Sequence, residues 1–145
     1  MYRHILVPTD GSALSMTAVQ NAMAFARDAG AKVTVLTVLE PFQIFSMDST
    51  QLSDTKAEYE THARQAADRH LAEAGSAAKA LGVPHELVQV TQALPWKAII
   101  DVAKDKQCDL IAMASHGRRG AAALILGSET VKVLTHSTIP VLVFR

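Results

Sequence analysis

The sequence predicts an α/β protein: a single five-stranded parallel doubly wound sheet with helices on both faces. Three observations predict this class. Short β-branched, apolar runs alternate with longer segments that have helical spacing. The runs are almost continuously apolar, which is typical of parallel strands buried on both faces. The 145 residues are 49% hydrophobic and 19% charged, which suits one folded domain over residues 1–145 and excludes a disordered chain.

The alternation predicts nine elements in the order β-α-β-α-β-α-β-α-β. The expected strands cover residues 2–7, 32–38, 85–91, 110–114 and 139–144, and the expected helices cover residues 14–28, 53–81, 95–106 and 128–136. The stretch 40–51 lacks a clear period and is predicted to be a loop. Gly75 lies inside the alanine-rich second helix, which we expect it to bend or weaken.

The predicted topology directs attention to two loops. Right-handed crossovers in a small doubly wound sheet reverse the strand order once, and ligands bind outside the carboxyl ends of the strands at that reversal. In the common order 3-2-1-4-5, the reversal lies between the first and fourth strands. The loops at residues 8–12 and 114–128 are therefore expected to border the binding crevice.

Composition excludes several classes of function. The 14 Lys and Arg residues balance the 14 Asp and Glu residues, which argues against a general nucleic-acid or anionic-membrane surface. The single cysteine, Cys108, precludes an internal disulfide and a cysteine-rich zinc site. The histidines are scattered along the chain, so we expect no metal centre. No apolar run approaches the roughly 20 residues of a membrane span. We expect a cytoplasmic protein without membrane or nucleic-acid partners.

The loop after the fourth expected strand favours an anion site. Small residues within 114–117 allow backbone amides to approach a ligand closely. Gly127 and Ser128 open the next helix, whose unsatisfied amides and dipole attract an anion. Arg118 and Arg119 add positive charge. These features favour a phosphate-binding loop, and the alternative is an ordinary strand-to-helix loop that uses glycine for its turns.

Three segments resemble the universal stress protein family: residues 7–12 (VPTDGS), residues 114–128, and residues 139–143 (IPVLV). The resemblance covers essentially the whole chain. The ATP-binding members of this family carry the motif Gly-x2-Gly-x9-Gly-Ser/Thr. Gly117, Gly127 and Ser128 match the second half of this motif with the correct spacing, and Ala114 stands at the position of its first glycine.

The resemblance implies one nucleotide-binding domain over residues 1–145. It places Asp10 beside the adenosine and the backbone of Val38 at the edge of the adenine, with residues 113–117 around the ribose and phosphates. The complete set of implied contacts is Pro8, Thr9, Asp10, Val38, Met113, Ala114, His116, Gly117, Arg118, Arg119, Gly127, Ser128, Glu129 and Thr130. The alternatives remain open: Asp10 as a helix cap, Val38 as core only, and the arginines as solvated charges.

The resemblance further implies ATP or AMP as the ligand, with Mg²⁺ arriving only with ATP. It also implies a homodimer through the closing strand, at Val141, Leu142 and Val143, and an apolar edge strand independently favours pairing with a second copy. We expect a regulatory or signalling module of the stress response rather than an enzyme, with at most weak ATP hydrolysis and no assigned catalytic residue. The alternatives are a slow ATPase that uses Asp10 and a dimeric interaction module without nucleotide.

Overall fold

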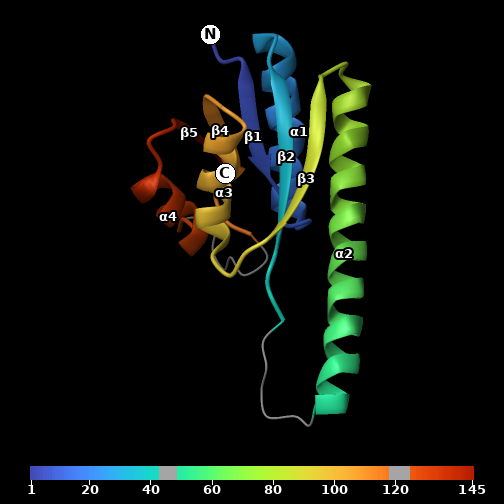
Figure 1. The fold of residues 1–145 in the computed structure, drawn as a ribbon. Coiled ribbons are helices and arrows are strands. Elements are labelled where there is room, and N and C mark those ends of the chain that lie inside the picture. The colour runs from blue at the N-terminus through green and yellow to red at the C-terminus, as the bar shows by residue number, and fades with distance from the viewer. Residues whose placement is uncertain (43–48, 118–124) are drawn as a thin grey trace.

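The sheet has the predicted strand order. The computed structural model describes residues 1–42, 49–117 and 125–145, and within them five parallel strands follow the order β3-β2-β1-β4-β5 (Figure 1). The strands are β1 (His4–Pro8), β2 (Lys32–Leu39), β3 (His85–Thr91), β4 (Leu110–Ala114) and β5 (Val141–Phe144). The helices are α1 (Ala13–Ala29), α2 (Ser49–Ala80), α3 (Pro95–Asp105) and α4 (Ser128–His136). The predicted class and strand order are confirmed.

Two apolar layers enclose the sheet (Figure 1). On one face, α1 and α2 pack on alternate side chains of the central strands, including Ile5, Val7 and Val35. On the other face, α3 and α4 pack on the intervening side chains, including Leu6, Leu36 and Ile111. Because successive strand residues point to opposite faces, both faces of β1, β2 and β4 are buried. This explains the continuous apolar runs.

The first helix begins and ends as its sequence indicates. The Ser12 hydroxyl accepts a hydrogen bond from the Ser15 amide at 3.2 Å, so Ser12 is the N-terminal cap of α1. Gly30 adopts the left-handed conformation, with φ of 66°, and its amide bonds back to the last turn. The Ser15 hydroxyl instead donates to the Thr9 hydroxyl at 2.8 Å and accepts the Asp10 amide at 3.2 Å.

The second helix differs from its prediction at two points. It begins at Ser49, within the stretch predicted to be a loop, because residues 49–52 include good helix formers. It also runs without interruption through Gly75, so the expected bend is wrong (Figure 1). Gly75 is buried where α2 crosses β3, and a β-carbon there would lie 3.4 Å from Leu87 Cδ1.

The last strand begins two residues later than predicted. The Ser137 hydroxyl donates to the Ile139 carbonyl at 2.7 Å and accepts from the Ile139 amide at 3.0 Å, which holds that residue in a turn. Pro140 follows, and its carbonyl accepts the Ile111 amide. β5 therefore starts at Val141. The first strand starts at His4 rather than at residue 2, because the Asp109 carboxylate accepts the amides of Arg3 and His4.

Candidate functional site

The loops beyond β1 and β4 meet at the reversal of strand order. Their strands are hydrogen-bonded neighbours although they are about a hundred residues apart in sequence. The clearest contact joins Asp10 to Gly117: a β-carbon added to Gly117 would overlap Asp10 Oδ2. The Asp10 carboxylate therefore lies directly against the Gly117 backbone. The structure thus brings together two residues that the sequence assigned to one crevice.

Asp10 Oδ1, the second oxygen of the carboxylate, stabilises the loop that follows β1. Asp10 Oδ1 accepts the Ser12 amide at 2.9 Å, so the side chain shapes the turn that leads into α1. Ser12, not Asp10, is the helix cap. One carboxylate consequently orders the first loop with Oδ1 while Oδ2 faces the second loop, at the edge where a ligand of this fold class enters.

Thr9 stabilises the loop between β1 and α1 through hydrogen bonds inside the protein. Its side chain is buried, and its hydroxyl accepts hydrogen bonds from Ser15 Oγ at 2.8 Å and from the Gly11 amide at 3.2 Å. The Thr9 carbonyl accepts the Thr37 hydroxyl at 3.1 Å. The Thr9 amide also donates to the Leu36 carbonyl at 2.8 Å. The hydroxyl and both backbone groups of Thr9 are therefore engaged within the protein, and the role of Thr9 is to hold the loop in place.

His70 is a neighbour of this loop that the sequence analysis did not assign to the site. It lies on α2, and a β-carbon on Gly11 would overlap its imidazole ring. Gly11 has a φ of 78°, a conformation that favours glycine. The helical spacing carried a usable signal, since position 70 lies three residues after the buried Ala67 and four before the buried Ala74.

The predicted contacts in the strands share one face of the sheet. Met113 is buried in the layer with α3 and α4, and the partly exposed Val38 packs against the same layer. Pro8 has the same orientation, because it lies two residues after Leu6 in β1. These three side chains come from the carboxyl ends of adjacent strands, on the face of the sheet that α3 and α4 cover.

Glycine at position 127 is required by the way the second loop closes. The Gly127 amide donates to the Ser115 carbonyl at 2.8 Å, and a β-carbon on Gly127 would lie 2.9 Å from His116 Cβ. The His116 ring is held by Ser115, with Oγ and Nδ1 3.0 Å apart. Arg118 and Arg119, the expected cations of this loop, lie outside the described residues.

The start of α4 offers backbone amides but fewer side chains than expected. Gly127 is its N-terminal cap and provides no side-chain acceptor, and the partly buried first turn begins at the exposed Ser128. The amides of residues 128–130 precede the first intrahelical donors. Two expected contacts are engaged elsewhere: the Thr130 hydroxyl donates to the Ala114 carbonyl at 3.0 Å, and the Glu129 carboxylate accepts the Trp96 amide at 2.8 Å.

Ala114 fits its position without strain. It is the last residue of β4, paired with Phe144 of β5 in the ladder. Its backbone is extended, and an extended residue accommodates a β-carbon. The methyl group is buried. Alanine in place of glycine therefore causes no backbone strain at position 114.

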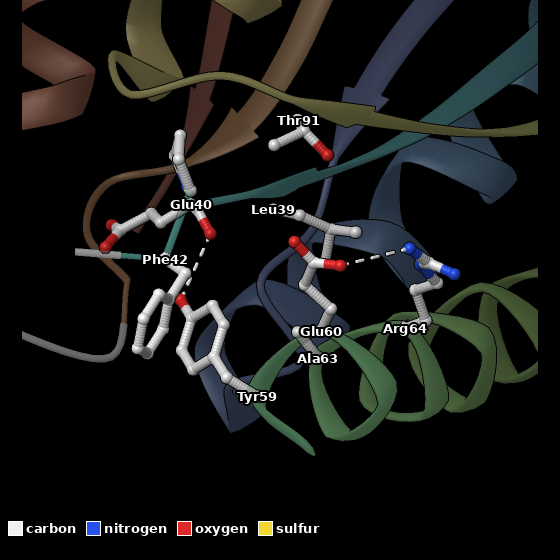
Figure 2. A pocket seen from close by; sticks show the side chains of 9 residues that line it. Leu39, Glu40, Phe42, Tyr59, Glu60, Ala63, Arg64 and Thr91 are labelled. Carbon is white, nitrogen blue, oxygen red and sulfur yellow. Dashed lines mark hydrogen bonds and ion pairs between the residues drawn. The ribbon is translucent and has the colours of Figure 1, made fainter. Parts of the chain in front are cut away.

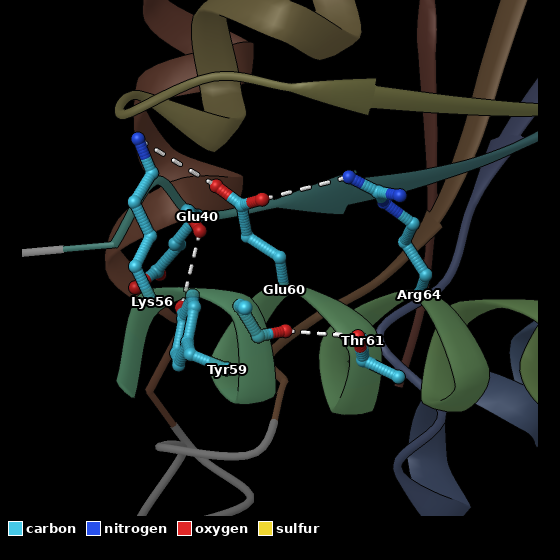
Figure 3. Close-up of polar contacts among 7 residues, drawn as sticks. Glu40, Lys56, Tyr59, Glu60, Thr61 and Arg64 are labelled. Carbon is cyan, nitrogen blue, oxygen red and sulfur yellow. Dashed lines mark hydrogen bonds and ion pairs between the residues drawn. The ribbon is translucent and has the colours of Figure 1, made fainter. Parts of the chain in front are cut away.

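A separate hollow lies at the carboxyl ends of β2 and β3, on the α2 side of the sheet (Figure 2). The Tyr59 hydroxyl donates to the Glu40 carbonyl at 3.1 Å, and the Phe42 and Tyr59 rings are 5.4 Å apart. Figure 3 shows the adjoining ion pairs of Glu60 with Lys56 and Arg64. With a volume of about 90 Å³, the hollow is smaller than sites that enclose a nucleotide-sized ligand.

The remaining chemistry of the described residues is limited. Burial raises the pKa of the Cys108 thiol to about 11, so it stays protonated and unreactive at neutral pH. Among the residues that the structure covers, no three His, Cys, Asp or Glu side chains gather as a metal site. Within those same ranges, no helix is both long and apolar enough to cross a bilayer.

The fold defines a doubly wound α/β protein in which the loops beyond β1 and β4 meet at a strand-order reversal, where proteins of this class bind ligands. All of residues 1–145 match the model of the Universal stress protein family, and the chain belongs to this family. A universal stress protein of Thermus aquaticus is 29% identical over 145 residues, which cover 100% of both chains. The predicted family membership is confirmed.

Solved structures agree with this assignment. The hypothetical protein MJ0577 of Methanocaldococcus jannaschii superposes with a TM-score of 0.82 at 26% identity, covering 99% of this chain and 95% of the other. A universal stress protein solved in complex with cAMP superposes with a TM-score of 0.73 at 27% identity, covering 99% of this chain and 97% of that chain.

Proposed function

We propose that this protein binds an adenine nucleotide, ATP or AMP, and acts as a regulatory or signalling module of the stress response in the cytoplasm. In this proposal residues 1–145 form one nucleotide-binding domain. The observation that carries it is the contact of Asp10 with Gly117 at the strand-order reversal, beside the start of α4. The relative solved with cAMP, at 27% identity, supports an adenine nucleotide as the ligand class.

The described residues suit the parts of such a ligand. The partly exposed Pro8 and Val38 offer apolar surface for a base, next to the layer in which Met113 is buried, and Asp10 offers a carboxylate to sugar hydroxyls. Ser128 and the first amides of α4 offer donors to phosphate oxygens. Because Glu129 and the Thr130 hydroxyl have other partners, the proposal assigns phosphate contact at residues 128–130 to the amides and to Ser128. Mg²⁺ would accompany ATP through its phosphates.

Titration calorimetry with ATP and with AMP tests this proposal. Saturable heat at submillimolar nucleotide supports it, and the Gly127→Leu variant should lose that heat because its side chain meets His116. An unfolding transition for the variant confirms that it is folded. The absence of heat with the native protein defeats the proposal. ATP turnover that depends on Asp10, measured with Asp10→Asn, would favour a slow ATPase instead.

Ala114→Gly separates nucleotide binding from an interaction module that has lost its ligand. Because Ala114 has an extended backbone, alanine is unstrained there, and the proposal is that the native protein already binds nucleotide. Nucleotide affinity should therefore change little in Ala114→Gly. If the native protein shows no binding and the glycine variant gains it, the interaction module is the better description.

We further propose that the protein forms a homodimer through β5. This strand is an edge of the described sheet, and Val141, Leu142 and Val143 are each partly exposed. An apolar edge strand is protected by pairing with a second copy of itself across a twofold axis.

A further inference from the structure

An acidic side chain of α4, the helix proposed to bind the phosphates, accepts a hydrogen bond from the neighbouring helix α3. α3 begins after Leu94, which makes no side-chain cap, and the amide of Trp96 in its first turn instead donates to Glu129 Oε2 at 2.8 Å. Glu129 belongs to the first turn of α4. A carboxylate at a helix N-terminus satisfies an orphan amide and the positive end of the dipole. Glu129 therefore caps α3 from α4.

The same tryptophan also contacts the far end of α4. The Trp96 ring stacks on the His136 imidazole, with centroids 4.6 Å apart and an interplanar angle of 28°. Glu129 and His136 are seven residues apart, so they lie two turns apart on one face of α4. Val133, between them, is fully buried against the layer that contains Ile99 of α3. Trp96 thus contacts α4 at its first turn and at its last residue, and α3 and α4 cover the same face of the sheet (Figure 1).

The direction of the Glu129 carboxylate matters for an anion at the start of α4. An acidic residue in a first turn can bond the amides of its own helix and repel a bound phosphate. Here Oε2 is directed to the amide of Trp96, and Oε1 lies 3.8 Å from Lys132 Nζ. The contact therefore turns the negative charge toward α3 and leaves the amides of α4 to a ligand.

We infer that Glu129 is a positioning residue of the nucleotide site: by capping α3 it fixes the start of α4, without touching the nucleotide itself. This inference rests on the proposed function. It replaces the expected direct contact of Glu129 with phosphate by an indirect role. It also makes Trp96, which is the only tryptophan of the chain, a built-in reporter of that role.

Two variants separate this role from a direct one. Glu129→Ala removes the acceptor and should weaken nucleotide binding about tenfold, the equilibrium effect of losing a helix cap. Glu129→Gln keeps an oxygen acceptor for the Trp96 amide and should restore affinity to within about threefold of the native protein. If glutamine and alanine weaken binding equally, the charge itself is needed, and the inference is overturned. It is equally overturned if both variants bind more tightly, because Glu129 then acts only by repulsion.

A second measurement works without any nucleotide. In the native protein, hydrogen exchange of the Trp96 amide should be slow, and Glu129→Ala should accelerate it about tenfold while Lys132→Ala leaves it unchanged. Tryptophan emission should shift in Glu129→Ala and not in Lys132→Ala. Unchanged exchange and emission in Glu129→Ala would overturn the inference even if the native protein binds ATP. A third result is possible: Glu129→Ala accelerates the exchange, but the native protein binds no nucleotide. In that case Glu129 still caps α3, whereas its assignment to a nucleotide site fails together with the proposed function.

Discussion

Gly11 and Gly117 lie in the loops beyond β1 and β4, and neither position has room for a β-carbon. At each position a β-carbon would overlap a side chain from a distant part of the sequence: His70 at Gly11 and Asp10 at Gly117. Close approach of this kind fixes two loops and one helix relative to one another. The sequence analysis identified Gly117 from its motif, whereas the partner of Gly11 required the path of α2.

Gly11→Ala tests the contact with His70. Both Gly11 and Gly30 have positive φ values, 78° and 66°, so alanine is strained at both. No atom lies within 4 Å of a β-carbon at Gly30. Gly30→Ala should therefore cost about 1 kcal/mol of unfolding free energy, from backbone conformation alone. Gly11→Ala should cost roughly 1–3 kcal/mol more, through overpacking.

Urea unfolding of the two variants measures this difference. Equal costs at the two positions would contradict the packing described for His70. Adding His70→Ala to Gly11→Ala should recover part of the loss, since the smaller side chain makes room for the new methyl.

Side-chain partners were the least predictable feature at this scale. Gly127 and Ser128 predicted a helix start correctly, and the family resemblance implied nucleotide contacts for Glu129 and Thr130 as well. The Glu129 carboxylate instead reaches Trp96, and the Thr130 hydroxyl reaches the Ala114 carbonyl. Both partners come from other elements of the chain. The sequence shows which polar side chains a helix start carries, but the tertiary fold determines which groups they hydrogen-bond.

At the scale of elements, α2 shows how packing accommodates a weak helix former. Gly75 has low helix propensity, yet the helix continues through it against β3. The buried side chains at 67, 71, 74 and 78 supply the apolar stripe that holds α2 on the sheet. Propensity at one residue therefore did not determine the outcome for a helix of this length.

Gly75→Ala should stabilise the protein. A β-carbon there would lie 3.4 Å from Leu87 Cδ1 and 3.6 Å from His85 Nε2, which are ordinary contact distances. The gain should be about 0.5–1 kcal/mol of unfolding free energy, from reduced entropy of the unfolded chain. Chemical denaturation measures it. Gly82→Ala is the matched control and should destabilise, because Gly82 has a φ of 67°. A loss of stability in Gly75→Ala would contradict the packing of α2 on β3.

A polar chain near the amino-terminal ends of β1, β2 and β3 joins the buried His4 and Thr34 to the exposed Glu86, and it makes stability depend on pH. His4 Nε2 and Thr34 Oγ1 are 2.7 Å apart, and the Thr34 hydroxyl donates to Glu86 Oε1 at 2.9 Å. Thr34 therefore accepts the proton of His4 Nε2. Burial, followed by the nearby Lys32, lowers the pKa of His4 below its usual value of 6.5. The hydrogen bond from Thr34 lowers the pKa of Glu86.

Acidification should therefore lower the free energy of unfolding in two steps, the first from His4 and the second from Glu86. Below about pH 6.5 the unfolded chain takes up a proton at His4 that the folded chain resists, so the unfolding free energy falls as the pH falls. The contribution of Glu86 is present above its unfolded pKa of about 4.5 and is lost as the pH falls through its lower folded value. Urea unfolding between pH 7.5 and 5.5 should show the first step, and His4→Gln should flatten it. An identical slope in His4→Gln would contradict this assignment.

Element boundaries were predictable wherever the sequence carries its own stop signal. Ser12 and Gly30 bound α1, and residues of these types signal a helix end directly because a cap acts through local backbone bonds. The start of β5 was misplaced because Ser137 bonds the backbone of Ile139, a side-chain contact that the apolar pattern does not reveal. The buried strands were readable because their apolar runs reflect cover on both faces.

The order of the strands determines which loops of the molecule lie next to one another. The reversal between β1 and β4 brings together loops that no short motif connects, and this step was predictable because parallel crossovers allow few topologies. The sheet also leaves β5 at one edge, where its four residues are partly exposed. The sequence could indicate this edge, but not what covers it.

Val143→Lys tests the proposed homodimer. A lysine on an edge strand opposes pairing with an identical strand, so the variant should be monomeric at concentrations where the native protein is a dimer. Leu94→Lys is the control, since Leu94 is a 45% exposed apolar residue that lies just before α3. Sedimentation or light scattering gives the mass. A native monomer, or a Val143→Lys variant that remains dimeric, would contradict the proposed interface.

The central claim is that an adenine nucleotide binds between the loops beyond β1 and β4. An NMR titration of the native protein with ATP, and separately with AMP, tests it most directly, because each amide reports its own surroundings. The account predicts saturable shifts at the amides of residues 10–12, 115–117 and 128–130, and none centred on Tyr59 and Glu60 at the hollow beside α2. An unchanged spectrum at millimolar nucleotide, or shifts centred on that hollow, would contradict it.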